Sequence, residues 1–157
     1  MKTSTLLRLW VFSLSLLLFA CNPDPEIPVV QDPPISQGDM WICHQNAVWD
    51  SVATINHLIG EWEWEYIRCF WNPEDGNYDD FKGLSIDFKS DNTLDVKMDG
   101  LVTQSSAWSI EGSNENLFVI RVEPIVLQAV GQILFCDNRV EFNDSYVDGC
   151  DNYFTRK

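Results

Sequence analysis

Residues 60–66 read GEWEWEY and decide the fold, because acidic and aromatic residues alternate without interruption from Glu61 to Tyr66. Successive side chains of a β-strand point to opposite faces, so this period of two places Trp62, Trp64 and Tyr66 on one face and the glutamates on the other. A helix would spread the same residues around all of its sides. The stretch therefore predicts a half-buried strand with an aromatic inner face, and a slip of one residue would exchange the faces.

The same strand pattern recurs along the rest of the chain. Turn-forming residues, such as those at 90–93 and the Asp137-Asn138 pair, separate short runs rich in β-branched and aromatic side chains. These runs predict further strands at residues 84–89, 94–98, 102–111, 117–123, 131–136, 139–142 and 151–156. About eight short strands without alternating helices predict an all-β fold, an antiparallel up-and-down barrel, because eight strands suffice to close a sheet on itself.

In the segment that precedes residue 60, the apolar residues are spaced as in a helix. Residues 40–59 contain apolar side chains at spacings of four, three and four, namely Val48, Val52, Ile55 and Ile59. Such spacing outlines one face of a helix, and Gly60 supplies a stop. We therefore expect one short N-terminal helix, packed against the barrel by Trp41 and Trp49.

Residues 1–38 differ in composition from the rest of the chain. A basic start and an apolar run over 9–19 are followed by the small residue Ala20, which is typical of a signal peptide. The run is about half as long as the ~20 residues of a membrane-spanning helix. Prolines between 23 and 34 favour an extended chain. We predict a signal peptide at 1–20, a proline-rich tether at 21–38 and one β-barrel domain at 39–157.

The sequence Leu18-Phe19-Ala20-Cys21 resembles the bacterial lipobox. The resemblance implies cleavage before Cys21, lipidation of its thiol and anchoring in the cell envelope, where two or three acyl chains hold a protein stably. Asn22 after the cysteine argues for the outer membrane, and the surface and periplasmic sides both stay open. The alternative is an ordinary secreted protein without lipid.

The charge balance limits the kinds of partner. The chain has a formal net charge of −14, and removal of residues 1–20 takes away Lys2 and Arg8 but no acid, which leaves 8 basic residues of 10 against 24 acidic ones, a net of −16. Such a chain is a poor match for nucleic acid or anionic lipid surfaces. It leaves room for cationic partners or calcium. We expect the membrane to be reached through the lipid, and the oligomeric state stays open.

Four cysteines remain after Cys21, namely Cys43, Cys69, Cys136 and Cys150. An even number in an exported chain predicts two disulfides. Of the three pairings we favour the two that each close a short segment, Cys43–Cys69 and Cys136–Cys150. No Cys-x-x-Cys pair occurs, so we predict neither a metal site nor a cofactor.

The sequence Leu58-Ile59-Gly60-Glu61-Trp62 resembles the lipocalin signature, a Gly-x-Trp at the start of the first barrel strand. Arg156 lies near the end of the last predicted strand, where lipocalins carry an arginine over that tryptophan. The resemblance implies barrel closure by Gly60, Trp62 and Arg156, with a cation–π contact that stabilises by ~0.5–2 kcal/mol. Residues 50–157 as a whole look like the lipocalin-like lipoproteins of Bacteroidetes.

Two functions follow as hypotheses. If the barrel is hollow, its inward aromatic residues line an apolar calyx, and the protein carries or senses a small hydrophobic ligand. The predicted calyx residues are Trp62, Trp64, Tyr66, Phe88 and Trp108. If the barrel is filled, these residues are its core. The protein is then an interaction module that binds a protein or glycan at the cell envelope through its loops.

No catalytic arrangement is evident. His44 and His57 lack a nucleophile or carboxylate partner in the sequence, and no Gly-x-Ser-x-Gly motif occurs, so we do not expect an enzyme. Oxygen ligands at Asp75, Asn77, Asp79 and Asp80 copy only part of a calcium loop. Asp50-Ser51-Val52 resembles the site at which Bacteroidetes attach O-linked glycans.

Overall fold

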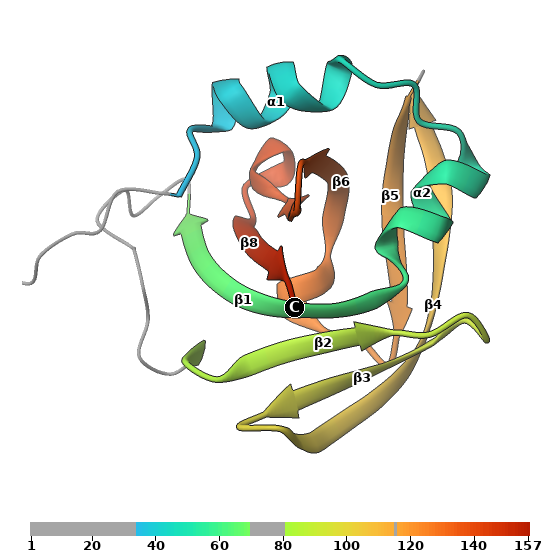
Figure 1. Ribbon diagram of the computed structural model, residues 1–157, viewed down its shortest axis with the longest axis vertical. Coiled ribbons are helices and arrows are strands. Elements are labelled where there is room, and N and C mark those ends of the chain that lie inside the picture. Colours follow the sequence, from blue (N-terminus) through green and yellow to red (C-terminus); the bar gives the residue numbers. More distant parts are fainter. Residues whose placement is uncertain (1–33, 70–80, 115) are drawn as a thin grey trace, which may run out of the picture.

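The computed structural model describes residues 34–69, 81–114 and 116–157, and within them eight antiparallel strands form a closed barrel (Figure 1). The strands pair in chain order, and the last pairs with the first. They are β1 (Gly60–Cys69), β2 (Leu84–Phe88), β3 (Thr93–Met98), β4 (Leu101–Asn114), β5 (Leu117–Glu123), β6 (Gly131–Cys136), β7 (Arg139–Asn143) and β8 (Cys150–Arg156). The predicted all-β up-and-down barrel is confirmed.

Two short helices, α1 (Gln37–Gln45) and α2 (Ser51–Leu58), replace the single predicted helix. The Asp50 carboxylate accepts a hydrogen bond from the Ala53 N–H and so begins a new helix, which interrupts the predicted period. Val48 is consequently 83% exposed, and the prediction of one continuous apolar face was wrong. In the described part of the chain no helix is long and apolar enough to cross a membrane.

The helices lie at different places on the barrel. α1 packs across the outer face of β6 through Met40, which contacts Leu134 in a small apolar cluster (Figure 1). α2 leads directly into β1, and its buried Leu58 belongs to the core inside the barrel. We call the end covered by α2 the closed end. The opposite end, where β1 finishes and β8 begins, we call the mouth.

Three described loops lie at the mouth because neighbouring strands run in opposite directions. They are the β3–β4 turn, the β5–β6 loop with the 3₁₀ turn η2 (Leu127–Ala129), and the β7–β8 loop with the 3₁₀ turn η3 (Ser145–Val147). Any molecule that enters the barrel from the mouth passes these loops.

Aromatic side chains fill the barrel toward the closed end. Trp62, Phe88 and Phe154 are fully or almost fully buried in one core cluster. Phe88 meets Trp108 edge to face with ring centroids 5.4 Å apart, an arrangement in which aromatic pairs attract each other beyond the area that they bury. In this half of the interior the aromatic side chains therefore pack against one another.

A β-bulge changes the direction of side chains within β1. Its pairing with β8 shifts between Trp64 and Tyr66, so one extra residue stands in β1 and the alternation of faces restarts. Trp62 and Trp64 point inward, whereas Tyr66 lies on the outer face with its ring 5.9 Å from that of Tyr153. The interpretation of Tyr66 as an inward residue was wrong.

Two disulfides are present, but the favoured pairing was wrong. The bonds join Cys43 to Cys136 and Cys69 to Cys150, across sequence separations of 93 and 81 residues. Barrel closure sets Cys69 directly opposite Cys150, and α1 carries Cys43 onto β6. Strand register therefore decides one bond and the docking of α1 decides the other, whereas the length of the enclosed segment decides neither.

Candidate functional site

The closed end is fastened by Arg156. Its guanidinium lies 4.2 Å above the centre of the Trp62 ring, and its Nη1 donates to the carbonyl oxygen of Ile59 at 3.1 Å. Nη2 donates to the carbonyl oxygen of His57. The Trp62 indole N–H donates in turn to the carbonyl oxygen of Leu58 at 2.7 Å. These contacts join the end of α2 to the first and last strands.

Gly60 makes room for this arrangement. Its φ of +131° is a backbone conformation that favours glycine. A Cβ at this position would lie 2.8 Å from Nη1 of Arg156. The structure thus brings together Gly60, Trp62 and Arg156, the three residues for which the sequence suggested barrel closure.

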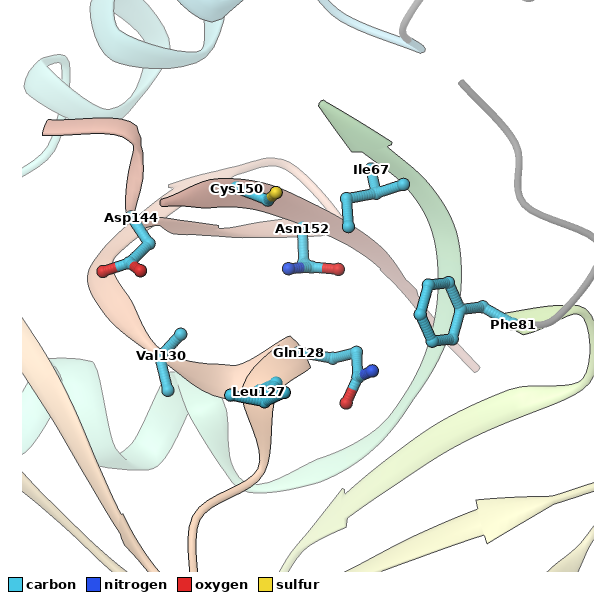
Figure 2. Close-up of a pocket in the computed structure, with 8 residues that line it drawn as sticks. All are labelled: Ile67, Phe81, Leu127, Gln128, Val130, Asp144, Cys150 and Asn152. Atoms are coloured by element: carbon cyan, nitrogen blue, oxygen red, sulfur yellow. The ribbon is translucent and has the colours of Figure 1, made fainter. Parts of the chain in front are cut away.

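The mouth contains a pocket of about 260 Å³ (Figure 2). Its wall is made of the inner faces of β1 and β8, the segment just before β2, the β5–β6 loop and the start of the β7–β8 loop. The described lining residues are Ile67, Phe81, Leu127, Gln128, Val130, Asp144, Cys150 and Asn152. Most of this wall is apolar, and the volume lies just below the ~300–1,000 Å³ range of drug-sized ligand pockets.

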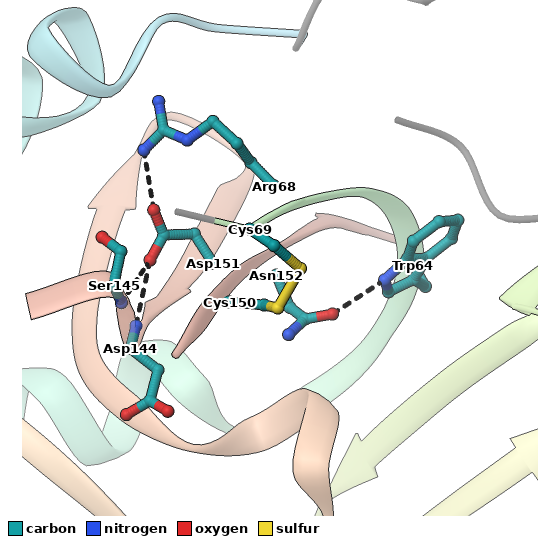
Figure 3. Close-up of a disulfide and its surroundings, with 8 residues drawn as sticks. All are labelled: Trp64, Arg68, Cys69, Asp144, Ser145, Cys150, Asp151 and Asn152. Carbon is teal, nitrogen blue, oxygen red and sulfur yellow. Dashed lines mark hydrogen bonds and ion pairs between the residues drawn. A yellow bond between two sulfur atoms is a disulfide. The ribbon is translucent and has the colours of Figure 1, made fainter. Parts of the chain in front are cut away.

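Trp64 and the Cys69–Cys150 disulfide support the wall of the mouth pocket (Figure 3). The Trp64 indole N–H donates to Oδ1 of Asn152 at 3.2 Å, and the Trp64 ring lies 5.3 Å from that of Phe81. The disulfide holds the end of β1 against the start of β8. The pocket therefore rests on fixed side chains, a condition for a preformed binding site.

The predicted calyx residues mostly lie elsewhere. Trp62, Phe88 and Trp108 belong to the packed interior, and Tyr66 lies on the outer face. Trp64 contacts two lining residues of the mouth pocket, Asn152 and Phe81. Sequence reasoning missed the β5–β6 loop, although its run IVLQAV at residues 125–130 is unusually apolar for a connection between strands.

Three polar side chains line the mouth pocket, those of Gln128, Asn152 and Asp144. Asp144 is the only charged one among the described lining residues. Burial, and then the nearby carboxylate of Asp151, raise the pKa of Asp144 above its usual value. The pocket can thus surround an apolar group and offer amide groups and one carboxylate.

Asp151 fixes the β7–β8 loop beside this pocket (Figure 3). Its buried carboxylate accepts the N–H groups of Asp144 at 3.0 Å and Ser145 at 2.9 Å. The other oxygen pairs with Arg68 at 2.7 Å. Asp151 lies on β8, and its hydrogen-bond donors lie on the β7–β8 loop and on β1. Its carboxylate therefore holds the loop to both strands.

The two histidines have packing roles. Nδ1 of His44 accepts the Phe135 N–H at 3.0 Å, which leaves Nε2–H to donate to the carbonyl oxygen of Asn116 at 3.1 Å. Burial lowers the pKa of both His44 and His57, so both rings are neutral at pH 7. Neither ring contacts a described hydroxyl or thiol nucleophile. Cys43, Cys136 and Asp137 come together, but the cysteines are disulfide-bonded and offer no thiolate to a metal.

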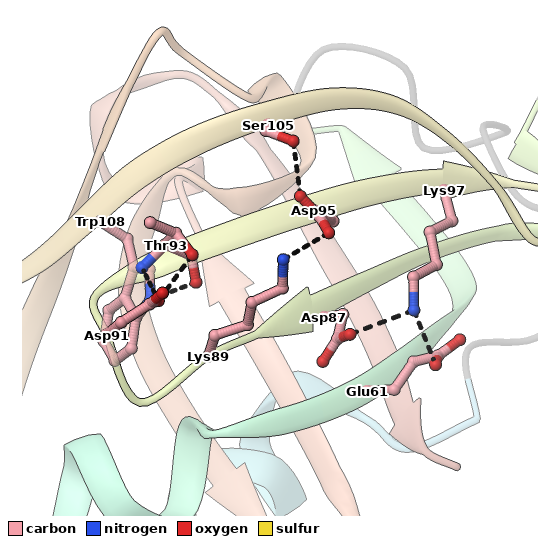
Figure 4. A network of polar contacts seen from close by, with 9 residues as sticks. All are labelled: Glu61, Asp87, Lys89, Asp91, Thr93, Asp95, Lys97, Ser105 and Trp108. Atoms are coloured by element: carbon pink, nitrogen blue, oxygen red, sulfur yellow. Dashed lines mark hydrogen bonds and ion pairs between the residues drawn. The ribbon is translucent and has the colours of Figure 1, made fainter.

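The acidic outer face of β1 forms ion pairs (Figure 4). Glu61 contacts Lys97 and Lys157, each at 3.0 Å, and these hydrogen bonds lower its pKa to about 2. Lys97 also pairs with Asp87 at 3.1 Å. Such exposed ion pairs stabilise the fold by ~0–1 kcal/mol each. We therefore interpret this network as a stabilising contact between strands on the outside of the barrel.

The remaining motifs separate into two groups. Asp50 caps α2, which gives it a structural role, while Ser51 and Val52 are exposed. The predicted signal peptide, Cys21, most of the predicted tether and the partial calcium loop of Asp75, Asn77, Asp79 and Asp80 lie outside the described residues.

Comparison of the chain with family models, curated proteins and solved structures gives no match. The resemblance to lipocalin-like lipoproteins therefore stays a prediction.

Proposed function

We propose that this protein is a lipocalin-like lipoprotein of the bacterial envelope that binds a small hydrophobic ligand in the mouth pocket, as a carrier or sensor. The observation that carries the proposal is the apolar wall formed by Ile67, Phe81, Leu127 and Val130. A closed barrel fastened by an Arg156–Trp62 contact supports it. The cluster of buried aromatic side chains toward the closed end favours a ligand site at the mouth.

The test is a titration with 1-hexanol, monitored by amide chemical shifts. Leu127 lines the pocket and is 67% exposed, so Leu127→Gln removes apolar wall without disturbing the core. We expect about fivefold weaker binding, from ~1 kcal/mol of lost apolar contact. Val52→Gln is the matched control, because Val52 is 64% exposed on α2 at the closed end. Equal affinities of the two variants would contradict a ligand site at the mouth.

The lipid anchor is tested separately. Intact mass of the protein from its membrane fraction should show acyl chains on an N-terminal Cys21, and Cys21→Ala should abolish both the added mass and the membrane association. A Cys21→Ala protein that stays in the membrane fraction contradicts anchoring by lipid.

A second candidate is the interaction module that binds a protein or glycan. It is favoured by exposed apolar side chains on the described mouth loops and at the start of β4, namely Leu101, Ile125, Leu127, Tyr146 and Val147. Native mass spectrometry of the purified protein separates the candidates. A co-purified small molecule supports the carrier, and a bound protein or glycan with an empty pocket supports the module.

A further inference from the structure

We infer that the mouth pocket selects ligands that combine an apolar body with a cationic ammonium group, and that the Asp144 carboxylate receives this group. The inference rests on the proposed function and specifies its ligand class. It starts from a charged side chain in a mostly apolar wall (Figure 2).

The Asp144 carboxylate has no partner among the described residues. Asp144 occupies the N-cap position of η3, where an aspartate side chain ordinarily accepts backbone N–H groups. Here it makes no such capping bond, and the two backbone N–H groups at the start of the turn, those of Asp144 and Ser145, donate to Asp151. The Asp144 carboxylate is consequently free to receive a donor from a ligand.

Gly149 leaves space for this carboxylate. A Cβ on Gly149 would lie 2.0 Å from Oδ2 of Asp144 and 2.5 Å from its Cγ, so any side chain there would displace the carboxylate. The backbone of Gly149 does not have a positive φ, so its conformation does not call for glycine. The need for space beside the Asp144 carboxylate accounts for a glycine at position 149.

The surrounding charges favour a cation. No positively charged side chain is among the described lining residues, and Arg68 is paired with Asp151. Lys82, next to Phe81 in the chain, is exposed. The net charge of −14 also attracts cations to the surface of the protein. A ligand ammonium would supply the counter-ion that Asp144 lacks.

The experiment compares hexylammonium with 1-hexanol, two probes of nearly equal shape, on the wild type and three variants at pH 7. The wild type should bind hexylammonium at least about tenfold more tightly, as expected for a charge-assisted hydrogen bond in a partly buried site. Asp144→Asn should remove this difference and leave hexanol binding unchanged. Gly149→Ala should weaken hexylammonium binding more than hexanol binding.

Asp148→Asn is the matched control, because Asp148 is an exposed carboxylate of the same loop with a φ of +65° that asparagine tolerates. It should change neither affinity. A ¹³C titration of the Asp144 carboxyl in the wild type gives a second test that needs no variant. Hexylammonium should lower the Asp144 pKa, and hexanol should not.

The outcomes separate the two proposals. Equal binding of both probes to the wild type overturns the cationic selection and leaves the proposed function intact. A preference for hexylammonium that survives in Asp144→Asn also overturns the role of Asp144. If neither probe binds the wild type, the proposed function fails and the inference fails with it.

Discussion

Replacement of Glu141 by glutamine should stabilise the protein above neutral pH. Glu141 is fully buried on the outer face of β7, where its Oε1 accepts a hydrogen bond from Nδ2 of Asn143 at 2.9 Å. Its Oε2 makes no hydrogen bond of ordinary geometry, and the buried Tyr153 hydroxyl interacts with this carboxyl group only weakly. Burial, followed by the negative charge of Asp151, raises the pKa of Glu141 from 4.5 to about 7.

The sign of the effect follows from proton linkage. The folded protein holds the Glu141 proton to higher pH than the unfolded chain does, so the free energy of unfolding falls as pH rises from 4.5 to about 7. Each pKa unit corresponds to ~1.4 kcal/mol. Above the pKa of Glu141 in the folded protein, the free energy of unfolding is therefore lower by about 3 kcal/mol than at acidic pH. Glutamine keeps the shape and the acceptor oxygen but cannot ionise.

Urea unfolding, followed by tryptophan fluorescence between pH 4.5 and 8, measures this difference. Glu141→Gln should raise the free energy of unfolding by up to about 3 kcal/mol at pH 8 and by little at pH 4.5. Glu111→Gln is the control, since the Glu111 side chain is 60% exposed and should show almost no such dependence. A gain that does not grow with pH, or a loss at pH 8, would refute the reasoning.

Three further predictions concern stability. Arg156→Ala should lower the unfolding free energy by ~2–3 kcal/mol, measured in urea, because the Trp62 contact and two carbonyl hydrogen bonds are lost; Arg156→Lys should recover only part. Glu61, with its pKa lowered to about 2, contributes stability above pH 4.5 that is lost as pH falls toward 2. Because its pairs are solvent-accessible, Glu61→Gln should reduce the loss of unfolding free energy between pH 4.5 and 2, measured in urea, by no more than ~1 kcal/mol. The double variant Cys69→Ala/Cys150→Ala should unfold ~2–4 kcal/mol more easily in urea, and an unchanged midpoint would contradict a stabilising cross-link.

The strands were predictable because their determinants are local. The alternation in GEWEWEY and the turn residues between later runs each depend on a few neighbouring residues, and eight strands then suffice for closure. The bulge after Trp64 was not predictable, since one extra residue in β1 is defined only by its pairing with β8. Tyr66 consequently lies on the outer face of β1 and not on the predicted inner face.

Features that depend on distant contacts were also missed. Neither Cys43–Cys136 nor Cys69–Cys150 follows from spacing, because barrel register and the docking of α1 bring those residues together. The predicted helix is interrupted over residues 46–50, because α1 ends at Gln45 and the Asp50 side chain caps a new helix. The pocket was overlooked because sequence reasoning selected the largest aromatic residues, which fill the core. The mouth is lined mainly by smaller loop and strand-end residues.

The Cys69–Cys150 bond also has a consequence for association between copies of this chain. A closed barrel presents no free strand edge only as long as its first and last strands stay paired, and an opened seam would offer unpaired backbone groups to another molecule. The bond joins those two strands across 81 residues of chain. The reduced protein should therefore exchange strands between copies and aggregate more readily, even under conditions in which its native fold is still favoured.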